Sequence, residues 1–254
     1  MDYQRMEQLI KKYASEYLDK PGEVFFSSKT AFKDNNGVMF IGLNPGGNKL
    51  PPIRNHLKSY WKQESTTYYS TNHYSGFLDQ CWHEPEFSEG KICKKCEEAK
   101  KTSNGCIEPN RHQKRVREIA KHLGIDLRKS VSTNAIWIQT RDAITLSGEI
   151  NIYKVFSESF FPIFLEIFKE TKPKLVICLG NGVEGSSFGL FHRAIETDKT
   201  AITSVANFKN GKFFQWQNSH VGKIIFFGTP HPSRFELTSK GLDLLKEMYS
   251  KFRV

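Results

Sequence analysis

The chain has 254 residues, and its 37 lysines and arginines outnumber its 27 aspartates and glutamates, which gives a formal net charge of +10. No segment approaches the roughly 20 apolar residues of a membrane span, and the first residues lack an apolar stretch of signal-peptide length. We therefore expect a soluble, intracellular (cytoplasmic) protein with no membrane partner. The basic charge favours a polyanionic ligand such as nucleic acid, and the length suits one α/β domain with an insertion.

Helices and buried strands alternate along the sequence. Residues 3–18 place apolar side chains on one helical stripe, and residues 38–42 form a short apolar run typical of a strand covered on both faces. Further predicted elements are a short helix at 54–62, a loop at 64–80, a helix at 111–123, a strand at 130–138, a helix at 152–172 kinked at Pro162, a strand at 174–180, a helix at 183–195, a hairpin at 201–222, a strand at 223–228 and a helix at 237–252. This alternation predicts a three-layer α/β/α sandwich with a mostly parallel, four-stranded central sheet, in a single domain over residues 1–254.

Four of the five cysteines fall within residues 78–112, which we interpret as an insertion in this domain. They are Cys81, Cys93, Cys96 and Cys106. A Cys-x2-Cys spacing lets two thiolates bind one ion, and clustered cysteines in a reducing compartment indicate a metal. We expect one structural zinc ion on the four cysteines, with His83 or His112 as substitute ligands and no organic cofactor. An iron–sulfur cluster and free thiols are the alternatives.

Two predicted strands end in loops rich in glycine, proline and polar residues. The strand at 38–42 leads into Gly42-Leu43-Asn44-Pro45-Gly46-Gly47, whose glycines allow a ligand to approach the backbone closely. The strand at 223–228 leads into Thr229-Pro230-His231-Pro232-Ser233-Arg234, where two prolines hold His231 on a stiff backbone. Because the carboxyl ends of parallel strands share one edge of a sheet, we expect both loops at one site.

These two loops, in this order, resemble the paired active-site loops of the uracil-DNA glycosylase superfamily. The Asn-Pro-Gly form is most similar to the mismatch-specific and single-strand-selective branches, and the resemblance covers residues 36–250 in outline. It implies a DNA glycosylase of base-excision repair that acts on double- or single-stranded DNA. Such an enzyme flips a uracil or another altered pyrimidine out of the DNA and hydrolyses its N-glycosidic bond. Hypoxanthine is a further possible substrate.

The resemblance also implies roles for individual residues. Asn44 would hold the attacking water, and His231 would donate a hydrogen bond to the oxyanion that develops on the base. Asn134, on the second core strand, would read the Watson–Crick edge of the base, although an asparagine at a strand end is also a common turn former. Tyr60 or Trp61 would sandwich the base. The other implied substrate-binding residues are Gly42, Leu43, Pro45, Gly46, Ser233 and Arg234.

Three departures from the family pattern bear on this interpretation, one of which is that Arg234 occupies a position where family members vary. The first loop lacks the acidic residue of the most proficient uracil enzymes, so we expect a weaker or differently specific enzyme. The cysteine-rich insertion lies outside the shared core. One alternative is a non-catalytic nucleic-acid-binding protein with the same fold, which would hold single strands with the zinc knuckle and aromatic side chains. In another, the knuckle docks a protein partner and the core is a scaffold.

Overall fold

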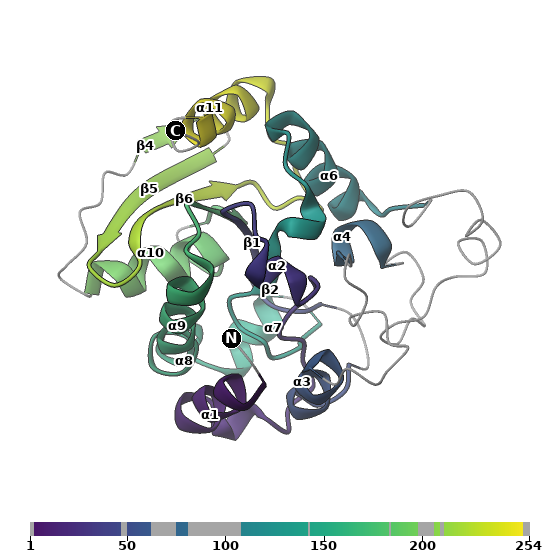
Figure 1. Cartoon of the computed structure of the whole chain (residues 1–254), viewed down its shortest axis with the longest axis vertical. Coiled ribbons are helices and arrows are strands. Elements are labelled where there is room, and N and C mark those ends of the chain that lie inside the picture. Colours follow the sequence, from purple (N-terminus) through teal and green to yellow (C-terminus); the bar gives the residue numbers. More distant parts are fainter. Residues whose placement is uncertain are drawn as a thin grey trace.

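The computed structural model describes residues 3–46, 50–61, 75–80, 108–141, 143–182, 184–197, 206–208 and 211–250. Its strands in these ranges are β1 (Val38–Gly42), β2 (Val131–Asn134), β3 (Leu175–Leu179), β4 (Ala206–Phe208), β5 (Gly211–Asn218) and β6 (Gly222–Thr229). They form one sheet in the order β2-β1-β3-β6-β5-β4 (Figure 1). The first four strands in this order pair in parallel, whereas β5 is antiparallel to β6 and β4 is antiparallel to β5.

The fold is therefore α/β with a mostly parallel sheet, as predicted, but the prediction of four strands was wrong because the sheet has six in the described part of the chain. The hairpin predicted near residues 201–222 is present as β4 and β5, and it continues the sheet by pairing with β6. Trp216, Phe214 and Phe226 are fully buried where these strands pair. Burial of these side chains against one another stabilises the pairing of β5 with β6 and so makes the hairpin part of the sheet.

The helices follow the predicted order, and the structure adds short helices at 30–33, 76–79 and 143–149 that were not predicted. The helices are α1 (Tyr3–Tyr13), α2 (Thr30–Lys33), α3 (Ile53–Trp61), α4 (Gly76–Asp79), α6 (Arg111–Leu123), α7 (Ala143–Glu149), α8 (Ile152–Val155), α9 (Phe161–Thr171), α10 (Ser187–Thr197) and α11 (Ser239–Ser250), with 3-10 turns η1 (Ser15–Tyr17) and η4 (Leu127–Lys129) and a π-helical turn η5 (Phe156–Phe160). The predicted loop at 64–80 contains α4, and the strand predicted to reach residue 138 ends at Asn134. The helix predicted at 152–172 is divided by the π-helical turn η5. Pro162 lies in the first turn of α9, where a backbone N–H has no intrahelical partner, so its missing N–H breaks no hydrogen bond.

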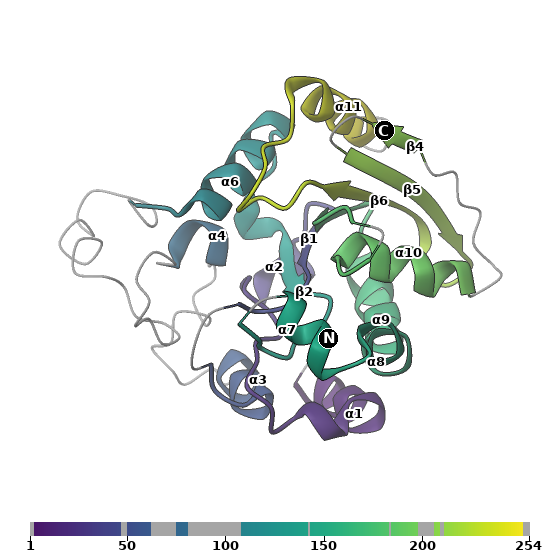
Figure 2. The same cartoon turned by 180° about the vertical axis from the view of Figure 1, so that it is seen from behind.

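Helices pack on both faces of the sheet, which gives helix, sheet and helix layers (Figures 1 and 2). Successive residues of β1 alternate between the two cores. Met39 and Ile41 belong to the core formed with α1, α9 and α10, while Val38 and Phe40 belong to the core formed with α6 and α11. A run of apolar residues without alternation is what this double burial requires.

Beside β1, the direction in which successive parallel strands are added to the sheet reverses. From β1 the chain continues to β2 on one side, then returns across β1 to form β3 on the other side. The segments that follow β1 and β3 therefore diverge at their carboxyl ends. In open α/β sheets this divergence is where ligands bind.

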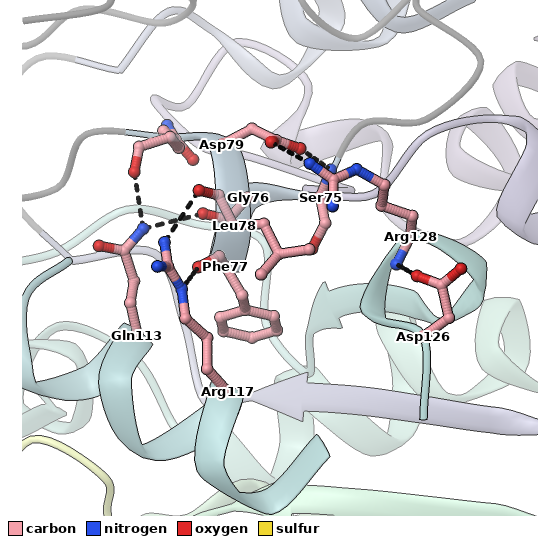
Figure 3. Close-up of polar contacts among 10 residues, drawn as sticks. Ser75, Gly76, Phe77, Leu78, Asp79, Gln113, Arg117, Asp126 and Arg128 are labelled. Carbon is pink, nitrogen blue, oxygen red and sulfur yellow. Dashed lines mark hydrogen bonds and ion pairs between the residues drawn. The ribbon is translucent and has the colours of Figure 1, made fainter. Parts of the chain in front are cut away.

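The short helix α4 is held by side chains of α6 (Figure 3). Arg117 donates hydrogen bonds to the carbonyl oxygens of Phe77 and Leu78, each at 2.8 Å. The buried amide of Gln113 donates to the carbonyl oxygen of Gly76 at 3.0 Å and to that of Gln80 at 2.6 Å. These bonds satisfy carbonyls that a helix of four residues cannot satisfy internally.

Gln113 also fixes the two ends of the predicted insertion relative to each other. Its Nε2 donates to the Gln80 carbonyl on one side, and its Oε1 accepts from the backbone N–H of Asn110, the N-cap of α6, at 3.1 Å on the other. One side chain thus bonds to Gln80 and to Asn110, which flank the cysteine-containing stretch in the sequence. Cys81, Cys93, Cys96 and Cys106 lie outside the described residues, so the zinc site stays a prediction.

Phe164 provides a test of the core. Its ring packs edge-to-face on Phe191 at 5.0 Å between centroids and also meets Trp137, Phe156 and Phe168. We expect Phe164→Ala to lower the free energy of unfolding by about 3–5 kcal/mol, because it leaves a cavity in the core. Phe235→Ala makes the same change at a side chain that is 62% exposed, and we expect a shift within about 0.5 kcal/mol. Equal shifts of the urea midpoint in both variants would contradict this packing.

Candidate functional site

The two predicted loops leave the sheet at the same edge. Ile41 in β1 pairs with Cys178 in β3, and Cys178 pairs with Gly228 in β6. Two strand spacings put the Cα atoms of Ile41 and Gly228 roughly 10 Å apart. Asn44 follows the end of β1 by two residues and His231 follows the end of β6 by two residues. Parallel pairing therefore brings together residues that are far apart in the sequence.

The side-chain amide of Asn44 is held in one orientation. Its Nδ2 donates to Thr140 Oγ1 at 2.9 Å and lies 3.1 Å from the carbonyl oxygen of Pro45 and 3.4 Å from that of Ile138. An amide nitrogen is a donor and an amide oxygen an acceptor, so three acceptors around one atom identify it as the nitrogen. Oδ1 is then on the opposite side of the amide group, as a hydrogen-bond acceptor.

The segment after β2 makes hydrogen bonds to residues that follow Asn44 in the chain. Gln139 Nε2 donates to the carbonyl oxygen of Gly46 at 3.3 Å, and its Oε1 accepts from the backbone N–H of Leu50 at 2.8 Å. Thr140 also donates its backbone N–H to the carbonyl oxygen of buried Pro45 at 3.3 Å. Gln139 and Thr140 were not predicted as site residues, and their signal in the sequence is two polar residues directly after the apolar run 135–138.

Asn134 ends β2 beside the same loop. It is paired in register with Gly42, and a Cβ atom at position 42 would lie 2.4 Å from Asn134 Oδ1. Only glycine at 42 therefore lets this amide lie over the end of β1. The backbone carbonyls of Gly42 and Leu43 accept from the N–H groups of Ala135 and Ile136, each at 2.9 Å. The strand ends are thus joined where the predicted base-reading residue lies.

The hydrogen bonds of His231 define its tautomer. Its Nδ1 accepts from the backbone N–H of Ser233 at 3.3 Å. In a neutral imidazole whose Nδ1 is an acceptor, Nε2 carries the hydrogen. Desolvation of the ring lowers the pKa of His231, and the positive charge of Arg234 lowers this pKa further. His231 is therefore a neutral Nε2–H donor near pH 7.

The rest of the second loop is braced by α6. Arg115 donates to the carbonyl oxygen of Pro232 at 2.6 Å and forms an ion pair with Glu236 at 3.0 Å. The carbonyl oxygen of His231 accepts from the backbone N–H of Arg234 at 2.9 Å, and the Ser233 and Arg234 side chains are exposed. Phe235 was not predicted as a site residue, and among the described residues it is the large hydrophobic side chain that is exposed to solvent. An aromatic residue shortly after His-Pro was the signal in the sequence.

Two further predictions concern aromatic and histidine side chains. Tyr60 has no exposed surface and packs on Phe25 with 5.3 Å between ring centroids. A ring in the core cannot stack on an extruded base, which contradicts the prediction for Tyr60. The side chain of Trp61 lies outside the described part of the chain. His112, named as a substitute zinc ligand, stacks on Phe77 and contacts the second loop, and its role as a ligand stays a prediction.

Comparison with known proteins gives no family to which the chain can be assigned. No protein-family model matches it, and no curated protein matches its sequence. Among the described residues, no helix is long and apolar enough to span a membrane, and no three histidine, cysteine or acidic side chains are grouped to hold a metal ion. Function therefore has to be inferred from the two loops themselves.

Thr140 tests how Asn44 is held. Thr140→Val removes the acceptor of the 2.9 Å bond from Asn44 Nδ2 without changing the shape of the side chain. We expect a loss of about 1 kcal/mol in the free energy of unfolding and a shifted, broadened Asn44 side-chain amide signal in NMR spectra. Thr140→Ser keeps the hydroxyl and should preserve that signal. An unchanged signal in the valine variant would show that Thr140 does not orient Asn44.

Proposed function

We propose that the protein is a monofunctional DNA glycosylase that hydrolyses the N-glycosidic bond of a flipped uracil or another altered pyrimidine. The observation that carries this proposal is the convergence of Asn44 and His231 at one edge of the sheet, each with a defined hydrogen-bonding atom. One offers an acceptor and the other a neutral donor. Hydrolysis of this bond needs both, on opposite sides of the bond that breaks.

Asn44 would position the attacking water. Its Nδ2 is occupied by protein acceptors, so Oδ1 is the atom that can accept a hydrogen from water. The water oxygen bonds to the anomeric carbon of the deoxyribose as the carbon–nitrogen bond breaks. No strong base is present in this loop, which fits a transition state in which the sugar already has oxocarbenium character when water attacks.

His231 would stabilise the departing base. As the bond breaks, negative charge collects on the base and its carbonyl oxygen, and a neutral Nε2–H donates to that oxygen. The attacking water loses one proton as its oxygen becomes the hydroxyl of the sugar, and the departing base gains one proton, which completes the reaction. The backbone N–H groups of Gly42 and Leu43 are further candidate donors, because they lie at the end of β1. Asn134 would read the Watson–Crick edge with its amide donor and acceptor.

Several features support DNA as the partner. The net charge of +10 favours binding to a polyanion. Arg111, Lys114 and Arg115 of α6 line an open hollow beside the second loop, together with Glu118 and with Glu236, which pairs with Arg115. Arg234 and Phe235 are exposed in that loop, where the cation can contact a phosphate and the ring can stack on bases. The four cysteines would hold one structural zinc ion in the adjoining segment.

The test is base release from labelled oligonucleotides that carry uracil, mismatched, deaminated or bulky modified bases, in single- and double-stranded form. Alkaline cleavage then reports each abasic site. We expect release of one class of altered base, and a single-turnover rate about 10²–10³-fold lower in His231→Ala, because an oxyanion donor is lost. Asn44→Ala should also lose most of the rate.

Lys246→Ala, at an exposed lysine of α11, is the matched control that removes a positive charge elsewhere. It should retain the parental rate. If folded Asn44→Ala and His231→Ala variants release the base as fast as the parent, the assigned roles are wrong. Binding to every oligonucleotide without release of any base would support the non-catalytic nucleic-acid-binding alternative.

Phe235 should contribute to DNA binding rather than to the chemical step. Loss of one stacked ring costs about 1–3 kcal/mol, so we expect Phe235→Ala to raise the Kd for substrate DNA by about 5–150-fold. The rate at saturating enzyme should change much less. Phe235→Trp retains a stacking surface and should restore binding. A parental Kd in the alanine variant would remove Phe235 from the DNA interface.

A further inference from the structure

His112, in the first turn of α6, lies against the His231 loop. The two imidazole rings meet edge-to-face, with 5.7 Å between centroids and 70° between planes. His112 Nδ1 is 3.3 Å from Ser233 Oγ. Ser233 therefore contacts both histidines, because its backbone N–H donates to His231 Nδ1 at 3.3 Å. One serine links the orientation of the two rings.

His112 is itself held by a rigid support. Its ring stacks on Phe77 with 6.0 Å between centroids and 12° between planes. Phe77 is fully buried and packs edge-to-face on Phe40 of β1 at 5.8 Å and on Phe26 at 5.2 Å. The bonds from Gln113 and Arg117 fix α4, which carries Phe77 (Figure 3). A continuous series of rings thus runs from β1 to His231.

We propose that His112 is a positioning residue that fixes the ring orientation and the Nε2–H tautomer of His231. This inference rests on the proposed function, since it assigns His231 its donor atom. His112 does not reach the base in this account. It acts through Ser233, whose hydroxyl it anchors and whose N–H must point at His231 Nδ1.

The charges around His231 are consistent with a neutral pair of rings. Burial lowers the pKa of His112 to about 3, and a charge on His231 would lower it further, so His112 stays neutral near pH 7. The charged groups near His231 are Arg234 on its own loop and Arg115 of α6, which is paired with Glu236. A neutral His112 adds no third positive charge there.

Two substitutions in the full chain separate the contacts of His112. His112→Phe keeps the ring on Phe77 but removes the bond to Ser233, whereas His112→Asn keeps a polar group near Nδ1 but removes the stacked ring. The first readout is the imidazole 15N signals of His231, which report its tautomer. The others are the single-turnover rate of base release and the Kd for substrate DNA. His122→Phe makes the same change near the other end of α6, where His122 pairs with Asp243, and is the control.

We expect His112→Phe to mix the His231 tautomers and to lower the single-turnover rate roughly tenfold at unchanged Kd. A factor of about ten in rate corresponds to the net contribution of about one hydrogen bond, here the one between His112 and Ser233. His112→Asn should lie between His112→Phe and the parent in both the His231 tautomer signals and the single-turnover rate. His122→Phe should match the parent in both. Ser233→Ala, at an exposed position, should mix the tautomers without endangering the fold.

A folded His112→Phe variant with the parental His231 spectrum would overturn the proposal. The NMR readout does not depend on activity, so the two inferences fail separately. If the parent releases no base from any oligonucleotide, the glycosylase function fails. The response of the His231 spectrum still decides whether His112 positions that ring.

Discussion

Parallel pairing of β1, β3 and β6 is the constraint on which the site depends. It fixes the two loops at the carboxyl edge of the sheet, with one strand between them, although Asn44 and His231 are far apart in the sequence. The crossing from β2 back to β3 separates the segments that follow β1 and β3. The two loops are therefore short extensions of largely buried strands, which limits how far their side chains can move.

Each loop is then oriented by a neighbour that makes no sequence motif with it. Gln139 and Thr140 hold the Asn44 loop from the segment after β2. In the second loop, His112 of α6 contacts Ser233, whose backbone N–H donates to His231 Nδ1. These supports leave one atom of each proposed catalytic side chain directed away from its protein partners. A fixed amide and a fixed imidazole lose less freedom when substrate binds, which favours catalysis by positioning.

The sequence was sufficient for features with a local physical signature. Apolar runs identified the four parallel strands, and glycine and proline identified the loops that contain Asn44 and His231. It failed where tertiary packing decides. Tyr60 looked available for stacking but fills the core, and α4 exists because Arg117 and Gln113 satisfy its carbonyls. The roles of Thr140 and His112 depend on contacts across 96 and 121 positions, which no local pattern carries.

The central claim is that both loops act on one extruded base. The most direct measurement is a crystal structure with DNA in which the excised nucleotide carries a 2′-fluoro group that blocks cleavage. The account predicts a flipped base with its Watson–Crick edge at Asn134, a carbonyl oxygen within hydrogen-bond reach of His231 Nε2, and a water between Asn44 Oδ1 and the anomeric carbon. A base that stays stacked in the DNA, or that lies away from either loop, would contradict it.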